Sequence, residues 1–181
     1  MNNSTAGVTL FAGFISDLLA QYEAQRNSTA RELFAMSSGV DLSDPTRPLP
    51  MELYNHMCAW IERKLGPANL RRSGERIGER AYEQMVAGGG LGSAPTPHDI
   101  LEQLVLAAAF MIQDPEKRGW VLVESQEKRA VMRRTQTFHP VLQEGLLRSL
   151  VRKSGAIYPK VSYLRSVASG DPYDEYEITW T

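Results

Sequence analysis

The sequence predicts an α+β fold, in which a helical N-terminal half packs on a C-terminal antiparallel sheet. Three observations carry this prediction. Apolar residues recur three and four positions apart up to residue 113, β-forming runs dominate after residue 119, and one amphipathic stretch, residues 138–153, interrupts those runs. The expected order is therefore five helices, two strands, one helix and two strands, which is typical of an α+β chain.

Length and composition favour one domain. With 181 residues, 43% of them hydrophobic, the chain suits a single domain over residues 1–181, with a helical layer at 4–113 and a β-rich layer at 119–181. The net charge of −1 argues against a nucleic-acid partner. A single cysteine, Cys58, and the lack of a long apolar run predict a cytoplasmic protein with no membrane insertion.

The N-terminal half contains five stretches with a helical spacing of apolar residues. A connection at residues 41–50, with three prolines, is expected to be irregular. The last helix is apolar almost all round, which predicts a central position. The expected helices are Val8–Tyr22, Ala30–Ser37, Met51–Leu65, Ala68–Ala87 and Thr96–Gln113.

The fourth of these helices carries a row of charges. Its arginines and the glutamates between them are Arg71, Arg72, Arg76, Arg80, Glu75 and Glu79. Because opposite charges lie four residues apart, we expect a solvated face with ion pairs inside the helix. Nucleic-acid binding is the alternative, and the near-zero net charge disfavours it.

Glycines mark two further features of this region. Gly74 and Gly78 lie inside a helix, where glycine is costly, so they indicate close contact with another helix or, as the alternative, with a ligand. The glycine cluster at residues 88–92 lacks the preceding strand and the Lys-Ser/Thr of a phosphate loop. We therefore interpret it as a hinge or linker.

The C-terminal half reads as two hairpins around one helix. Trp120–Glu124 and Arg129–Gln136 are expected to form the first hairpin, and Val161–Val167 and Glu175–Trp180 the second. The helix at 138–153 carries a glycine, Gly145, in the middle of its apolar stripe. That glycine predicts close approach by another backbone or by a ligand.

Three features of the sequence point to a known fold. They are the order of the elements, the helix segment Gly145-Leu-Leu-Arg-Ser-Leu150 between two hairpins, and the closing Tyr176-Glu-Ile-Thr-Trp180. Together they resemble the ligand-binding fold shared by haem nitric-oxide/oxygen sensor domains, 4-vinyl-reductase-type domains and Bet3-type vesicle-tethering proteins. The resemblance implies a cavity for a hydrophobic ligand between the helical half and the sheet. It also implies a role as a sensor or as an assembly module.

The haem branch of this resemblance implies two further features. These are an axial histidine in a helix before the first hairpin and a Tyr-x-Ser-x-Arg stretch that holds the propionates. Counting back from Gly145 puts Met132, Arg134 and Gln136 at those three positions, so the propionate motif is absent. His98 is the axial candidate, although it follows Pro97 at the start of its helix. The cofactor therefore stays open, with haem as one candidate.

Nothing in the sequence predicts a catalytic centre. His56, with Met51, Met57 and Cys58 nearby, could offer soft ligands to a metal or haem, but it has no partner at i+4, and an interfacial role suits it. His139 suits a capping role, with a hydrogen bond to a ligand carboxylate as the alternative. Cys58 is interpreted as a small buried hydrophobe. We expect no metal site and no enzymatic activity.

The expected function is a sensory or regulatory domain that binds an apolar small molecule between the helical half and the sheet. One alternative is a structural or interaction module with a filled core, which binds a protein partner or forms a homodimer through its N-terminal helix. The third is a haem-based NO/O2 sensor. The residues predicted to bind the ligand are Met57, Trp60, Ile61, Leu104, Ala108, Met111, Leu142, Gly145 and Leu146.

Overall fold

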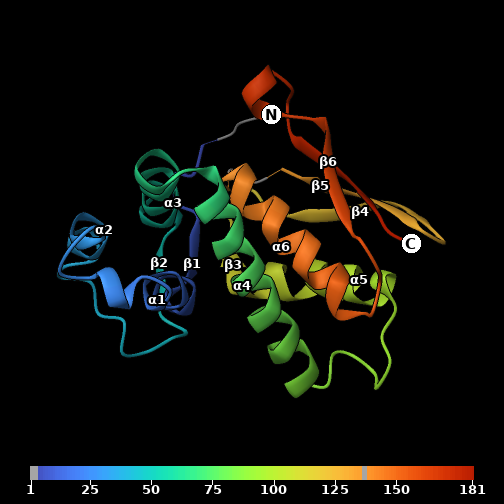
Figure 1. Cartoon of the computed structure of the whole chain (residues 1–181), viewed down its shortest axis with the longest axis horizontal. Coiled ribbons are helices and arrows are strands. Elements are labelled where there is room, and N and C mark those ends of the chain that lie inside the picture. Colours follow the sequence, from blue (N-terminus) through green and yellow to red (C-terminus); the bar gives the residue numbers. More distant parts are fainter. Residues whose placement is uncertain (1–3, 136–137) are drawn as a thin grey trace.

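The computed structural model describes residues 4–135 and 138–181 and shows a mixed α+β architecture, with helices first and most strands last, as predicted (Figure 1). The helices are α1 (Ala12–Ala20), α2 (Arg31–Met36), α3 (Met51–Leu65), α4 (Pro67–Ala87), α5 (Pro97–Met111) and α6 (Pro140–Lys153). The strands are β1 (Thr9–Phe11), β2 (Pro48–Pro50), β3 (Ile112–Gln113), β4 (Trp120–Gln126), β5 (Arg129–Arg134), β6 (Lys160–Arg165) and β7 (Asp174–Thr179).

The larger sheet has four antiparallel strands in the order β4-β5-β7-β6. Both predicted hairpins are confirmed, since β4 pairs with β5 and β6 pairs with β7. The two hairpins join through β5 and β7, where Ala130 lies opposite Ile178 and both side chains are buried. Strand β4 is longer than expected because Ser125 and Gln126 pair with the start of β5, which leaves a tight turn between the strands.

A second, smaller sheet was not predicted. It has the order β2-β1-β3, with Leu10 of β1 opposite Leu49 on one side and Ile112 on the other. Three expectations were wrong here. The first helix does not start at Val8, residues 41–50 are not irregular throughout, and the fifth helix does not reach Gln113. Partners distant in sequence supply the hydrogen bonds of each short strand, and such tertiary pairing overrides local spacing.

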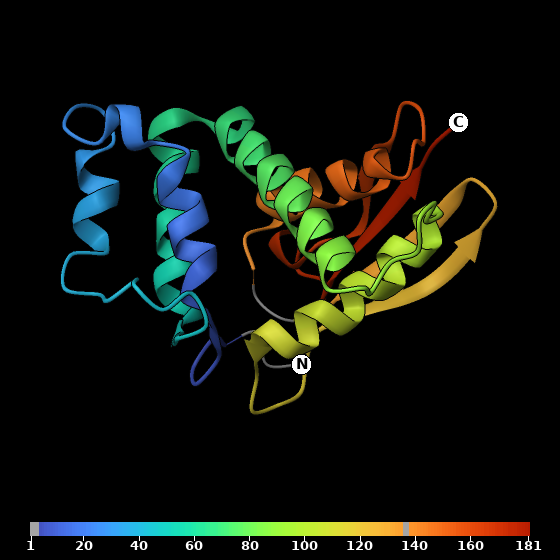
Figure 2. The same cartoon turned by 90° about the horizontal axis from the view of Figure 1, so that it is seen from below.

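Helices α4 and α6 lie side by side (Figures 1 and 2) and touch through glycines. A Cβ on Gly74 would overlap the carbonyl oxygen of Leu142, and a Cβ on Gly145 would overlap that of Arg71. At Gly78 a Cβ would lie 2.7 Å from the carbonyl oxygen of Leu146. Close helix–helix contact, predicted from Gly74 and Gly78, is therefore confirmed, and at Gly145 the approaching group is backbone.

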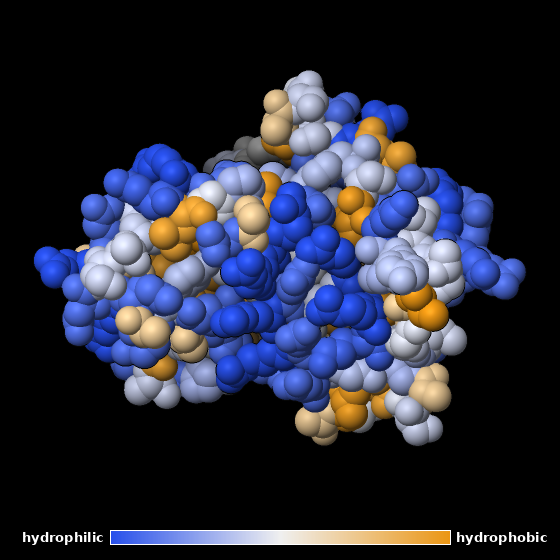
Figure 3. All heavy atoms as spheres, viewed as in Figure 1, coloured by the Kyte–Doolittle hydropathy of each residue, from blue (hydrophilic) through white to orange (hydrophobic). Residues whose placement is uncertain are grey.

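Ion pairs along the same helix pair correct the expectation of pairs inside α4. One pair per turn joins the two helices: Arg71–Glu144 at 2.8 Å, Glu75–Arg148, and Glu79–Arg152 at 3.0 Å. Because the glycine contact brings α6 so near, Glu75 and Glu79 of α4 pair with arginines of α6 instead. The molecule is correspondingly hydrophilic along this helix pair (Figure 3). In the described ranges, Arg72 and Arg76 form no ion pair.

Helix α5 is not central, although it was expected to be. It packs beside β4, burying Leu101, Leu104 and Ala108. However, Leu106 is 64% exposed and Phe110 is 74% exposed. In the described part of the chain, no helix is both long enough and apolar enough to cross a membrane. The outward side chains of Leu106 and Phe110 on α5 adjoin a cavity.

Candidate functional site

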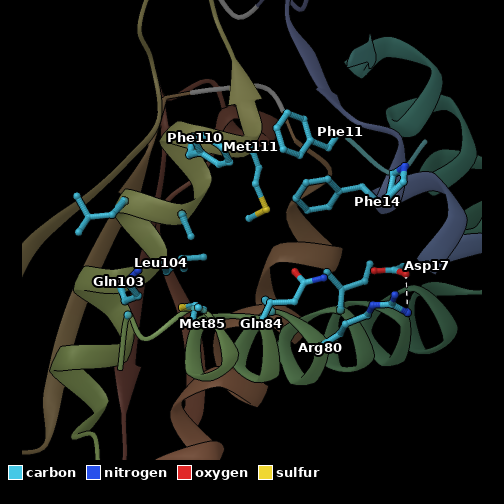
Figure 4. A pocket seen from close by; sticks show the side chains of 18 of the residues that line it. Phe11, Phe14, Asp17, Arg80, Gln84, Met85, Gln103, Leu104, Phe110 and Met111 are labelled. Atoms are coloured by element: carbon cyan, nitrogen blue, oxygen red, sulfur yellow. Dashed lines mark ion pairs between the residues drawn. The ribbon is translucent and has the colours of Figure 1, made fainter. Parts of the chain in front are cut away.

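A cavity of about 640 Å³ lies between α1, α4, α5 and the loop around residues 45–46 (Figure 4). Its volume is in the range of pockets that hold small molecules. Four segments that are distant in sequence supply its walls. The apolar part of the lining consists of Phe11, Phe14, Ile77, Ala81, Met85, Leu104, Leu106, Ala107, Phe110 and Met111.

Aromatic and thioether side chains form the upper part of the cavity. Phe14 and Met111 point into it from α1 and α5 (Figure 4). The ring of Phe11 meets that of Phe110 edge-on, with centroids 5.6 Å apart, and Phe14 meets the buried Tyr54 in the same manner at 6.2 Å. The contact with Tyr54 joins Phe14 to the core, whereas Phe110 is largely exposed at the edge of the cavity.

A few polar groups interrupt the apolar lining along α4 and α5. Gln84 and Gln103 can each offer an amide to a ligand, and an ion pair joins Arg80 Nη1 to Asp17 Oδ1 at 2.8 Å (Figure 4). Burial raises the pKa of the Asp17 carboxyl, and the positive charge of Arg80 opposes that rise. Apolar walls with a small number of polar groups are typical of small-molecule sites.

The structure brings two of the nine predicted ligand-binding residues into this cavity. Leu104 and Met111 line it. The α3 residues among the rest lie buried in the core, and the α6 residues pack against α4 or the core. The other seven do not line this cavity, and their role as ligand contacts stays a prediction. They are Met57, Trp60, Ile61, Ala108, Leu142, Gly145 and Leu146.

Sequence reasoning missed most of the lining because the cavity lies among helices and not between helices and the larger sheet. Phe11 and Phe14 were assigned only to an apolar stripe, and Arg80 only to a charged face. One signal was present in the sequence. The nearly all-round apolar character of α5 indicated a second apolar contact surface, which is the cavity wall.

The histidines lie elsewhere. His98 Nδ1 lies 2.7 Å from Ser125 Oγ, and its ring is 5.4 Å from that of Trp180. His56 is on the surface near Glu52, and His139 Nε2 lies 3.1 Å from a Glu62 carboxylate oxygen. All three histidines of the chain are in the described ranges, and none of them lines the cavity.

The arginines near the expected propionate motif, Arg133 and Arg134, interact with other side chains of the protein. Arg134 is buried between the rings of Trp120 and Phe138, with its guanidinium carbon 4.7 Å and 4.0 Å from the two ring centres. Arg133 forms an ion pair with Glu175 at 2.8 Å. Gln136 lies outside the described residues. The residues that line the cavity therefore do not fit a histidine-ligated haem, because the soft donors there are the thioethers of Met85 and Met111.

This geometry gives a direct expectation for haem. Purified protein mixed with hemin is expected to show no histidine-ligated haem spectrum, because no imidazole faces the cavity. The His98→Ala variant is expected to give the same absorption spectrum as the wild type. A sharp Soret band that the wild type shows and the variant lacks would contradict this account and assign the axial role to His98.

Burial shifts the pKa values of two reactive side chains, Cys58 and His139. Cys58 is buried, and burial raises the pKa of its thiol well above the usual value, so it is a poor nucleophile. Burial lowers the pKa of His139, and Glu62 opposes that shift. Among the described residues, no group of three or more histidine, cysteine, aspartate and glutamate side chains is placed to hold a metal ion.

Comparisons with known proteins place the fold. No protein-family model matches the sequence, and no match is found among curated proteins. Among solved structures, an H-NOX protein from S. oneidensis in the Fe(II)NO state aligns with a TM-score of 0.69 at 8% identity, covering 93% of this chain and 98% of that one. An oxygen-binding H-NOX domain related to soluble guanylate cyclases aligns with a TM-score of 0.61 at 10% identity, covering 100% and 95% of the two chains.

A third similar structure is the phenol-responsive sensory domain of the transcription activator PoxR, crystallised with phenol. It aligns with a TM-score of 0.54 at 12% identity, over 70% of this chain and 72% of that chain. At such identities the likeness concerns the path of the backbone. The predicted resemblance is confirmed at that level: the chain has the fold of the haem nitric-oxide/oxygen-binding (H-NOX) domains.

Proposed function

We propose that this protein is a sensory domain that binds a small apolar molecule in the cavity between α1, α4 and α5. The observation that carries the proposal is the cavity itself, whose apolar lining comes from four separate segments and is interrupted by few polar groups. The similarity to H-NOX domains and to a phenol-responsive sensory domain supports a sensory role. The role proposed here is binding without catalysis.

The exposed side chains at the mouth supply a driving force for binding. Leu106 and Phe110 present apolar surface to water, and covering such surface is favourable by about 25 cal/mol per Å². A ligand in the cavity covers part of both side chains. It also bridges α1 to α5, so that a bound molecule stabilises the relative position of these two helices. This change in helix position and rigidity is the proposed signal.

A neutral fluorescent probe tests the proposal. N-phenyl-1-naphthylamine is apolar, and its emission rises and shifts to the blue when it leaves water. Titration into the purified protein is expected to give saturable binding with one probe per chain. A signal that rises linearly without saturation, as for weak adsorption to the surface, would contradict the proposal.

The exposed side chains of Leu106 and Phe110 favour one alternative, an interaction module in which a partner protein covers the cavity. Leu106 and Phe110 would then pack against another protein or against a second copy of this chain. Light scattering after size exclusion distinguishes the two functions. A monomer that binds the probe supports the ligand-binding domain, whereas a dimer that loses its association in the Phe110→Ser variant supports the interaction module.

A further inference from the structure

A second, smaller hollow adjoins the cavity at the end where α1 meets α4. Its volume is about 260 Å³, and its lining includes Arg76, Gln21 and Ala20. It shares Asp17, Ile77 and Arg80 with the main cavity. The two hollows are therefore neighbours that share a wall of Asp17, Ile77 and Arg80, and the smaller hollow adds a second arginine, Arg76.

The charge at this end is not balanced. Arg80 pairs with Asp17, which is the one acidic residue in the linings of the two hollows. Arg76 has no carboxylate partner among the described residues, because Glu75 and Glu79 on either side of it pair with α6. The smaller hollow therefore carries one positive charge in excess, contributed by Arg76, beside the apolar cavity.

We propose that the ligand is an amphiphile with a single negative charge, such as a medium-chain or aromatic carboxylate. Its apolar body would occupy the main cavity, and its carboxylate would lie between Arg76 and Arg80 in the adjoining hollow. This inference rests on the proposed ligand-binding function and adds the chemical class of the ligand.

The chemistry of the groups suits a monoanion. A guanidinium donates two parallel hydrogen bonds to a carboxylate, and such charge-assisted bonds are among the strongest in proteins. Asp17 repels any anion bound beside it, so a second negative charge on the ligand would find no compensating group. Elsewhere the cavity lining is uncharged, which leaves the Arg76 end as the position for a charged headgroup.

Isothermal titration with octanoate and 1-octanol tests this inference, since the two compounds have the same chain length and differ in charge. The wild type is expected to bind octanoate about tenfold more tightly than 1-octanol. The Arg76→Gln variant is expected to lose this preference and to keep the wild-type affinity for 1-octanol. The matched control is Arg72→Gln, which removes the same charge one turn earlier on α4, outside both hollows.

A gain-of-function variant completes the test. Asp17→Asn removes the repelling carboxylate and is expected to strengthen octanoate binding several-fold while 1-octanol binding changes less. Equal affinities for the two compounds, or equal losses in Arg76→Gln and Arg72→Gln, would overturn the anion inference and leave the proposed cavity function standing. Binding of neither compound, together with no saturable binding of N-phenyl-1-naphthylamine, would overturn both.

Discussion

Replacement of Gly145 by alanine is expected to destabilise the protein by about 3 kcal/mol or more, as measured by urea unfolding. The added Cβ would overlap the carbonyl oxygen of Arg71 and would lie 3.0 Å from the backbone nitrogen of Glu75. Both neighbours are backbone atoms of a regular helix, so neither can move aside cheaply. An alanine in a helix is otherwise about 1 kcal/mol better than a glycine, so the expected loss has the opposite sign to helix propensity.

Gly92→Ala is the matched control for this prediction. Gly92 has an ordinary φ angle, and a Cβ there would meet no atom within 4 Å, so its replacement is expected to change stability by less than about 0.5 kcal/mol. A Gly145→Ala protein as stable as the wild type would show that α4 and α6 are not in backbone contact. In that event the position of α4, and with it the cavity wall, would be in error.

Filling the cavity is expected to weaken ligand binding strongly. Ala107 on α5 lines the cavity, and Ala107→Phe would place a ring where we propose that the ligand binds. If the ligand loses contact with about 100 Å² of apolar surface, at about 25 cal/mol per Å², the loss is about 2.5 kcal/mol, close to a hundredfold in affinity. The measurement is the N-phenyl-1-naphthylamine titration, repeated on this variant.

The control for this second prediction is Ala109→Phe, which makes the same replacement two residues later on the same helix. Ala109 is exposed and lies outside the cavity lining, so its variant is expected to bind the probe as the wild type does. Equal losses in both variants would indicate that an added ring disturbs α5 in general. Undiminished binding in Ala107→Phe would place the ligand elsewhere in the molecule.

The sequence was sufficient for the fold wherever local signals and tertiary structure agree. Helix α3 begins after Pro50 and ends before Gly66-Pro67, and its bounds match the predicted Met51–Leu65. The two hairpins form in the β-forming runs predicted for them. Strands β1, β2 and β3 were missed because each has only two or three residues, and only its partners from distant parts of the chain make it a strand.

The candidate site was less predictable for two physical reasons. Apolar stripes do not distinguish a filled core from a cavity, and the buried residues Met57, Trp60 and Ile61 gave the same signal as Leu104 and Met111. The ion pairs of α4 were predicted within the helix because Gly74 and Gly78 indicated a close contact but did not identify α6 as the partner. The arginines of α6 form ion pairs with Glu75 and Glu79, so that Arg76 has neither glutamate as a partner and lines the smaller hollow.

The most direct test of the central claim uses methionine methyl groups as reporters of ligand position. Met85 and Met111 line the cavity, whereas Met57 and Met132 are buried in the core away from it. In a protein labelled with 13C at the methionine methyl groups, N-phenyl-1-naphthylamine is expected to shift the NMR signals of Met85 and Met111 and to leave those of Met57 and Met132 in place. Shifts at Met57 and Met132 without shifts at Met85 and Met111 would contradict the assignment of the binding site to the cavity between α1, α4 and α5.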